Sequence, residues 1–401
     1  MEQEESLEQP KVTFAVTPPK PEYIINELGQ KVRIFDWEDY QNRLRRRLVY
    51  KGDVDLNNKK LIVKHTWGIG DLMYVTCALR GLKEKFPKVN ITVISSYPEL
   101  LEGNPDVDVA WHWQALSSFL ELFDAVEDWY WLDYDVPFKG GFDYKRHLRT
   151  KPYFNEFIMQ LSEKSIKDLN EDEKAFLDQA SNSVINRYRM IALDLYCLHA
   201  YVEPKVKTVY YYPKPEELKF AREFYRHLRK AGLRPIVLMP HSSTIFKDYP
   251  HWKKVINILR DEPYHWLILD GYATNEWSGI GSMVSDCSGA FKLRHSAALA
   301  IEADLLCCSD TGLLYIRASQ GGRCVSLYGP HESEPFLHYF PSVKGLRVDY
   351  VIGVLPNVEK CCTVPCYIDV QNCRSGPRRP PPCLEQLDPE VVATTIRDML
   401  K

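Results

Sequence analysis

The chain has 401 residues, of which 45% are hydrophobic and 26% charged, and its formal net charge is −3 at pH 7. This length allows two domains with a core each, and this balance is that of a globular protein. Such a charge gives no reason to expect a nucleic acid as partner. The longest apolar runs fall well short of the ~20 residues that cross a bilayer, and the acidic start lacks the apolar core of a secretory signal. We therefore expect a cytoplasmic protein with reduced thiols and no transmembrane segment.

Residues 1–58 are polar and contain prolines, which predicts an N-terminal extension of the fold. Regular alternation begins at residue 60, with an apolar strand over 60–66 and a glycine turn over 67–71. A helical pattern over 72–86 and a second strand over 90–96 follow. This order of strand, turn, helix and strand is the start of a Rossmann-like half.

A second alternation follows the proline-punctuated segment 208–217, which we interpret as an interdomain linker. It contains strands near 235–241 and 265–271 and helices near 216–231, 252–259 and 293–302. The sequence thus predicts an α/β protein with two Rossmann-like domains facing across a cleft. The expected domains are 59–208 and 209–345, followed by a Cys-rich tail and a terminal helix over 346–401.

The most informative stretch is 303–330, where an apolar strand is followed by a polar turn, a helix and a second apolar strand. Asp310, Thr311 and Gly312 are typical of a helix start, and the glycines at 321–322 are typical of a helix end. In a doubly wound sheet, ligands bind beyond the carboxyl ends of the strands. A helix start at that place suits a diphosphate.

The first glycine turn holds Gly68 and Gly70, which let the backbone approach a ligand closely. A Gly-x-Gly turn is a weak signal when taken alone. Asp71 begins the helix behind this turn, and local rules leave it either as the N-cap or as a general base.

A polar loop follows the strand near 235–241. Ser242 and Ser243 offer hydroxyl and backbone donors, and Lys247 offers a cation, so together they could clamp a phosphate. The alternative is a surface lysine behind a serine-threonine turn.

Residues 310–312 also match the Asp-Thr-Gly turn of aspartic proteases. Those enzymes need two such carboxylates on an all-β fold. This sequence has one copy followed by a helical pattern, which disfavours the protease interpretation.

Five of the eleven cysteines lie within 23 residues near the end. Four thiolates from this loop could hold one Zn or Fe ion, although free thiols or an oxidised pair remain alternatives. The candidate metal ligands are Cys361, Cys366, Cys373 and Cys383. The fifth cysteine of this loop is Cys362. The six cysteines outside the loop lie in apolar patterns and are expected in the core.

The segments 68–108, 241–250, 293–330 and 383–392 together resemble the ADP-heptose:lipopolysaccharide heptosyltransferases, which are family 9 glycosyltransferases. The resemblance covers roughly residues 60–110 and 235–395. It implies a GT-B fold with an N-terminal acceptor domain and a C-terminal nucleotide-sugar domain. It also implies inverting transfer of a heptose or related sugar without a catalytic metal.

The resemblance further implies a role for each motif. Asp71 falls at the family's general base, and Lys247 falls at the lysine that neutralises the donor diphosphate. Ser242 and Ser243 lie in the phosphate loop, and residues 310–312 form the donor turn. The implied partners are an ADP-heptose-like nucleotide sugar and a glycan or lipid-linked glycan acceptor, as in lipopolysaccharide biosynthesis.

Tyr315 departs from the family pattern, because the family usually has a histidine at this position. A tyrosine can still hydrogen-bond a phosphate or a sugar, so we keep the enzyme interpretation. The alternatives are a non-catalytic nucleotide- or glycan-binding or assembly protein, an epimerase, and a transferase acting on protein or modified nucleic acid. Oligomerisation and peripheral attachment to the inner membrane face are left open.

Overall fold

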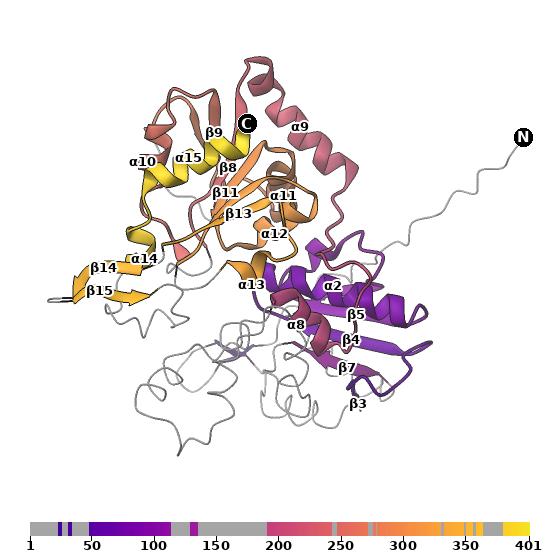
Figure 1. Ribbon diagram of the computed structural model, residues 1–401. Helices are drawn as coiled ribbons and strands as arrows, with labels where there is room; N and C mark the ends of the chain where they lie inside the picture. The colour runs from indigo at the N-terminus through magenta and orange to yellow at the C-terminus, as the bar shows by residue number, and fades with distance from the viewer. Residues whose placement is uncertain are drawn as a thin grey trace, which may run out of the picture. The chain divides into compact units, whose positions relative to one another are not determined.

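The computed structural model describes residues 23–25, 31–33, 48–113, 129–134, 191–242, 247–271, 276–277, 279–329, 333–348, 350–355, 358–363 and 380–401. The chain divides into two compact units (Figure 1). The first comprises Met1–Lys139 and Tyr196–Tyr212, and the second comprises Gly140–Leu195 and Pro213–Lys401. Among the described helices, none is both long and apolar enough to cross a membrane.

The first unit contains a five-stranded parallel sheet in the order β3-β7-β4-β5-β6. Its strands are β3 (Leu48–Val49), β4 (Lys60–His65), β5 (Asn90–Ser95), β6 (Val109–His112) and β7 (Tyr130–Asp133). The chain runs outward from β4 through β5 to β6 and then returns to the other side of β4 with β7. The strand order therefore reverses between β4 and β7, which makes this the switch point of the sheet.

Burial explains why the start of this unit could be predicted from sequence. Leu61, Ile62 and Val63 of β4 are almost completely buried, as expected for a parallel strand covered on both faces. Helix α2 (Ile69–Lys85) follows, and η1 (Pro98–Leu101) connects β5 to β6. The predicted order of strand, glycine turn, helix and strand is confirmed.

The second unit contains a six-stranded parallel sheet in the order β10-β9-β8-β11-β12-β13. Its strands are β8 (Arg234–Met239), β9 (Tyr264–Ile268), β10 (Val284–Asp286), β11 (Leu305–Ser309), β12 (Cys324–Leu327) and β13 (Val343–Leu346). Numbered along the chain, this is the 3-2-1-4-5-6 order of the Rossmann fold, with its switch point between β8 and β11.

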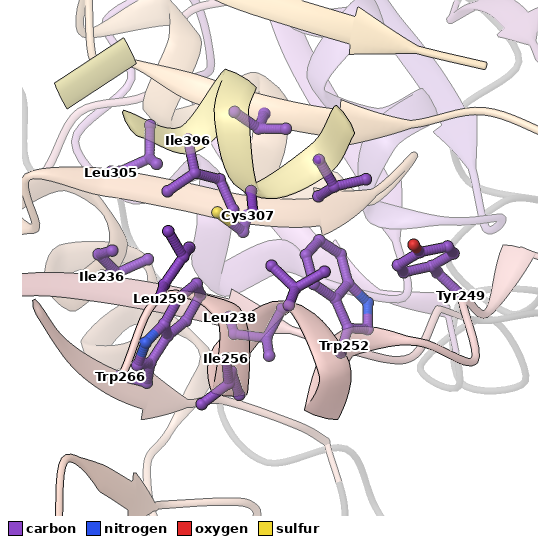
Figure 2. Packing of buried hydrophobic residues seen from close by; sticks show 14 of the residues in the cluster. Ile236, Leu238, Tyr249, Trp252, Ile256, Leu259, Trp266, Leu305, Cys307 and Ile396 are labelled. Carbon is purple, nitrogen blue, oxygen red and sulfur yellow. The ribbon is translucent and has the colours of Figure 1, made fainter. Parts of the chain in front are cut away.

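Helices cover both faces of this sheet. Helices α10 (Trp252–Ile258) and α15 (Pro389–Leu400) pack on one face. The opposite face is covered by a group of helices that pack on one another, namely α9 (Pro215–Lys230), α11 (Leu293–Glu302) and α12 (Gly312–Ser319). Figure 2 shows the first of these layers, in which Ile396 of α15 lies beside Leu305 and Cys307 of β11. Alternate residues of the strands supply the second layer, as the pleat requires.

Strand β11 begins two residues later than predicted. Ala303 is the C-cap of α11, and Asp304 donates its backbone N–H to the Pro235 carbonyl. The Asp304 carboxylate accepts hydrogen bonds from Arg229 and Arg234, so this residue fixes the turn before the strand. At the other end, Gly321 has a φ of +72° just after α12, and the predicted glycine stop is confirmed.

Short elements make up the described remainder. An antiparallel pair, β1 (Tyr23–Ile25) and β2 (Lys31–Arg33), precedes β3 in the chain. A second antiparallel pair, β14 (Tyr350–Leu355) and β15 (Val358–Thr363), lies in the tail. Helices α13 (Glu334–Leu337) and α14 (Pro382–Glu385) complete the second unit, and α8 (Ala192–His199) spans the division between the units.

Candidate active site

The switch point of the second unit brings Lys247 and Asp310 together. Asp310 follows β11 directly, and Lys247 lies in the loop after β8. The Lys247 Nζ atom is 2.6 Å from Oδ2 of Asp310, and the Ser309 hydroxyl donates to the Lys247 carbonyl. The lysine side chain is one-third exposed, so its cation lies at the surface of this cluster. The two loops are therefore joined through both side chain and backbone.

Asp310 is also held at its other oxygen. The Tyr315 hydroxyl donates to Oδ1, while the Tyr315 ring is 2% exposed and contacts the Phe340 ring at 5.6 Å between centroids. Tyr328 is buried next to this network, and burial raises the pKa of its hydroxyl well above the ordinary value. One carboxylate is thus fixed by a cation on one side and by a neutral donor on the other.

Helix α12 begins immediately after this carboxylate, with Thr311 as its N-cap and Gly312 as its first residue. The Thr311 side chain does not cap the helix; its hydroxyl lies 3.8 Å from Sδ of Met239. The first backbone N–H groups of a helix have no partner within it. This helix start carries a partial positive charge beside the Lys247 cation.

The phosphate-loop prediction is only partly within the described residues. Ser242 donates its backbone N–H to Oδ1 of Asp248 at 3.1 Å, and burial raises the pKa of Asp248. Ser243 lies outside the described residues.

Sequence reasoning missed a second polar cluster at the ends of β8 and β9. His241 Nδ1 lies 2.6 Å from Asp270 Oδ2, and His241 Nε2 lies 3.4 Å from Glu276 Oε2. The hydrogen bond with Asp270 raises the pKa of His241. A signal existed, because His241 and Asp270 each lie at the carboxyl end of a predicted strand, where ligands bind in such sheets.

Asp71 lies at the switch point of the first unit. The N-cap of α2 is Gly68, so Asp71 is inside the first turn and is not the N-cap. Its Oδ1 accepts a 2.8 Å hydrogen bond from the Tyr196 hydroxyl. Its Oδ2 is on the side of Gly68, where an added Cβ would lie 3.4 Å away. Gly70 is the second residue of α2, next to Asp71.

The tail cysteines are mostly beyond what the structure describes. Cys361 lies in β15, but its side chain is not described, and Cys366 and Cys373 lie outside the described residues. Cys383 is buried. Within the described part of the chain, no group of three or more His, Cys, Asp or Glu residues could hold a metal ion. Of the six cysteines expected in the core, Cys287 is half-buried and the others are buried.

Two Rossmann-like units in one chain, each with a polar cluster at its switch point, are the architecture of the GT-B fold. The sequence model of glycosyltransferase family 9 (heptosyltransferase) matches residues 162–368, which is more than half of the chain. The chain belongs to this family. No curated protein matches the sequence.

Solved structures similar to this chain are distant from it in sequence. The Escherichia coli ADP-heptose lipopolysaccharide heptosyltransferase II is 15% identical with a TM-score of 0.54, over 85% of this chain and 98% of that chain. A family 9 glycosyltransferase from Veillonella parvula is 18% identical with a TM-score of 0.46, over 74% and 88% of the two chains. The Escherichia coli heptosyltransferase WaaC with ADP is 14% identical with a TM-score of 0.45, over 85% and 99%. At 15% identity, the first of these likenesses shows the fold alone.

Proposed function

We propose that this protein transfers a heptose or related sugar from a nucleotide-diphosphate sugar to a hydroxyl of a glycan acceptor. The observation that carries the proposal is the pair formed by Lys247 and Asp310 at the switch point of the second unit. We assign the donor to residues 209–345 and the acceptor to residues 59–208. Membership of a family of heptosyltransferases supports a heptose donor, and the Escherichia coli heptosyltransferase II of the same fold is named for ADP-heptose.

On the donor side, the chemistry required is neutralisation of a diphosphate. Negative charge grows on the diphosphate when its bond to the sugar breaks. The Lys247 cation and the start of α12 are two positive groups from neighbouring loops, and fixed groups of this kind stabilise developing charge. Tyr315 would act through Asp310, because its hydroxyl is engaged there. The Ser242 loop and the cluster of His241, Asp270 and Glu276 would contact the remainder of the nucleotide.

On the acceptor side, the chemistry required is removal of a proton. In the proposed step, a carboxylate oxygen of Asp71 accepts the proton of the acceptor hydroxyl while the hydroxyl oxygen attacks the anomeric carbon. The bond from this carbon to the diphosphate oxygen breaks, and its electron pair leaves with the nucleoside diphosphate. Attack on the face opposite the leaving group inverts the configuration. The protein groups in this step need no metal ion.

Nucleotide binding tests the donor assignment. We would titrate ADP, UDP, GDP and CDP by calorimetry into the wild-type protein, Lys247→Ala and Lys254→Ala. Lys254 is an exposed lysine of α10 and serves as a matched control. We expect ADP to bind best and Lys247→Ala to weaken it about 10- to 100-fold, since hydrogen bonds to charged groups contribute about 1.5–3 kcal/mol. Absence of binding by all four, or equal loss in both variants, would overturn the proposal.

The alternative is a non-catalytic protein that binds the same nucleotide, and the Tyr315 departure from the family histidine is the observation in its favour. Asp71→Asn separates the two. A transferase loses turnover in this variant while it still binds ADP. A binding protein shows no release of ADP from ADP-heptose in either form.

A further inference from the structure

We propose that Tyr196 is a positioning residue for Asp71. The Tyr196 hydroxyl fixes the Asp71 carboxylate so that one of its oxygens faces the acceptor. The inference rests on the proposed role of Asp71 as the general base. Tyr196 and Asp71 belong to the same unit and are 125 residues apart in the sequence.

The contact between Tyr196 and Asp71 restricts the terminal side-chain torsion of Asp71. The terminal torsion of an aspartate is broad and roughly two-fold, so a carboxylate without a fixed donor samples many orientations. The Tyr196 hydroxyl donates to Oδ1 of Asp71 at 2.8 Å. This bond sets the plane of the carboxylate and leaves Oδ2 on the side of Gly68, where no Cβ stands. A base must have its lone pair aimed at the proton that it removes.

Tyr196 is itself held on several sides by aromatic rings. Its ring stacks on Tyr134, with centroids 5.2 Å apart and planes at 22°. Tyr74 of α2 lies at 5.5 Å and His65 of β4 at 6.3 Å. These rings come from α2, from the end of β4 and from the residue after β7, which are the elements of the switch point.

The backbone around Tyr196 is anchored to the sheet as well. The Tyr134 hydroxyl donates to the Tyr196 carbonyl at 2.8 Å, and the Tyr134 N–H donates to the Lys64 carbonyl at 2.9 Å. Strand β4 and helix α8 are thus joined through a single tyrosine. The ring contacts and this backbone hydrogen bond together hold Tyr196 in place. A residue that orients a catalytic group requires such support.

A different interpretation of the same contact makes an opposite prediction. A tyrosine hydroxyl that donates to the base resembles an acceptor hydroxyl, so Tyr196 could be occupying the acceptor's position. In that case Tyr196→Phe would lower the KM for the acceptor and leave kcat unchanged. A positioning residue gives the reverse, because its loss misaligns the base without emptying a binding position.

The test is steady-state release of ADP from ADP-heptose with a deacylated lipopolysaccharide as acceptor. For Tyr196→Phe we expect kcat to fall roughly 10- to 100-fold with the acceptor KM within about 3-fold of wild type, as for the loss of a hydrogen bond to a charged group. Unchanged kcat, or a lowered KM at unchanged kcat, would overturn the inference.

Two further variants make the outcome unambiguous. Tyr210→Phe removes a hydroxyl that donates to the Val206 carbonyl, and it should leave kcat unchanged. Asp71→Asn tests the proposed function itself. If Asp71→Asn retains full kcat, the proposed function fails and the inference with it. If Asp71→Asn is inactive and Tyr196→Phe is fully active, the inference alone fails.

Discussion

Lys247 and Asp310 follow different strands, yet the Nζ atom of the first lies 2.6 Å from Oδ2 of the second. The pairing means that the cation proposed to bind a diphosphate already has a carboxylate partner. A bound diphosphate would have to compete with the Asp310 carboxylate for the Lys247 cation. The negative charge of Asp310 would also repel the diphosphate. We therefore expect Asp310 to lower the affinity for the donor while it holds the lysine in place.

Replacing Asp310 with asparagine should separate these two effects. Asparagine keeps an oxygen to accept the Tyr315 hydroxyl but removes the negative charge. We expect ADP to bind about 3- to 30-fold more tightly, since unit charges several Å apart near a surface interact by about 1–2 kcal/mol or more. Calorimetry with ADP measures this, and Lys247→Ala should show the opposite sign. Weaker ADP binding by Asp310→Asn would contradict the arrangement.

Tyr315→Phe should destabilise the second unit more than it disturbs ADP binding. The variant keeps the buried ring against Phe340 but removes the donor to Oδ1 of Asp310. We expect a loss of about 1–3 kcal/mol in the free energy of unfolding, as for a hydrogen bond to a charged group. Urea unfolding measures the loss, and ADP affinity should change by less than about 3-fold. A large loss of affinity at unchanged stability would indicate direct contact with the donor.

Gly68→Ala tests the open side of Asp71. Gly68 has a φ of −67°, which alanine adopts without strain, and the new methyl would lie 3.4 Å from Oδ2. We expect the fold to be retained and kcat for ADP-heptose to fall roughly 10-fold, because access to the proposed base narrows by about one methyl group. ADP affinity, measured in parallel, should not change. Wild-type kcat would show that the acceptor does not approach Oδ2 from this side.

The site residues proposed from sequence lie in loops and helix starts behind predicted strands. Asp310 follows β11 directly, and Asp71 lies in the first turn of the helix behind β4, which is where a doubly wound sheet places its ligands. The observed strand orders support that reasoning, since the order of the strands reverses beside β4 in one sheet and between β8 and β11 in the other. Local apolar patterns were therefore enough to find the strands and helices that carry these residues.

Contacts between distant segments could not be predicted in the same way. Tyr196 lies on α8, where its pattern is that of an ordinary half-buried helix residue. Nothing local marks it as the partner of an aspartate 125 residues earlier. His241 and Asp270 likewise come together because β8 and β9 are neighbouring strands. The sequence of neither segment predicts that these two strands pair.

Breaking the buried ion pair between α9 and α11 should strongly destabilise the second unit. Arg294 donates to both carboxylate oxygens of Glu217, at 2.5 and 2.9 Å, and both side chains are buried. Arg294→Met leaves a buried charge and should cost about 3–5 kcal/mol in urea unfolding.

The matched double variant tests the cause of this loss. Glu217→Gln removes the charge and keeps an acceptor for the Lys214 N–H. Arg294→Met combined with Glu217→Gln should therefore be more stable than Arg294→Met alone. Equal stability of the single and double variants would show that lost packing, rather than the uncompensated charge, causes the effect.

His199 packs against Tyr134, one of the rings that hold Tyr196, and it should make the stability of the protein depend on pH. Burial lowers the pKa of His199 from 6.5 to about 4, and its ring lies 4.6 Å from that of Tyr134. Between these two values the unfolded chain binds a proton that the folded chain does not, so stability falls as pH drops from about 6.5 to about 4. His199→Phe keeps an aromatic ring without this proton. In urea unfolding, the free energy of unfolding of this variant relative to wild type should therefore rise as the pH is lowered from 7 to 5. A difference that does not change with pH would show that His199 does not contribute to acid sensitivity.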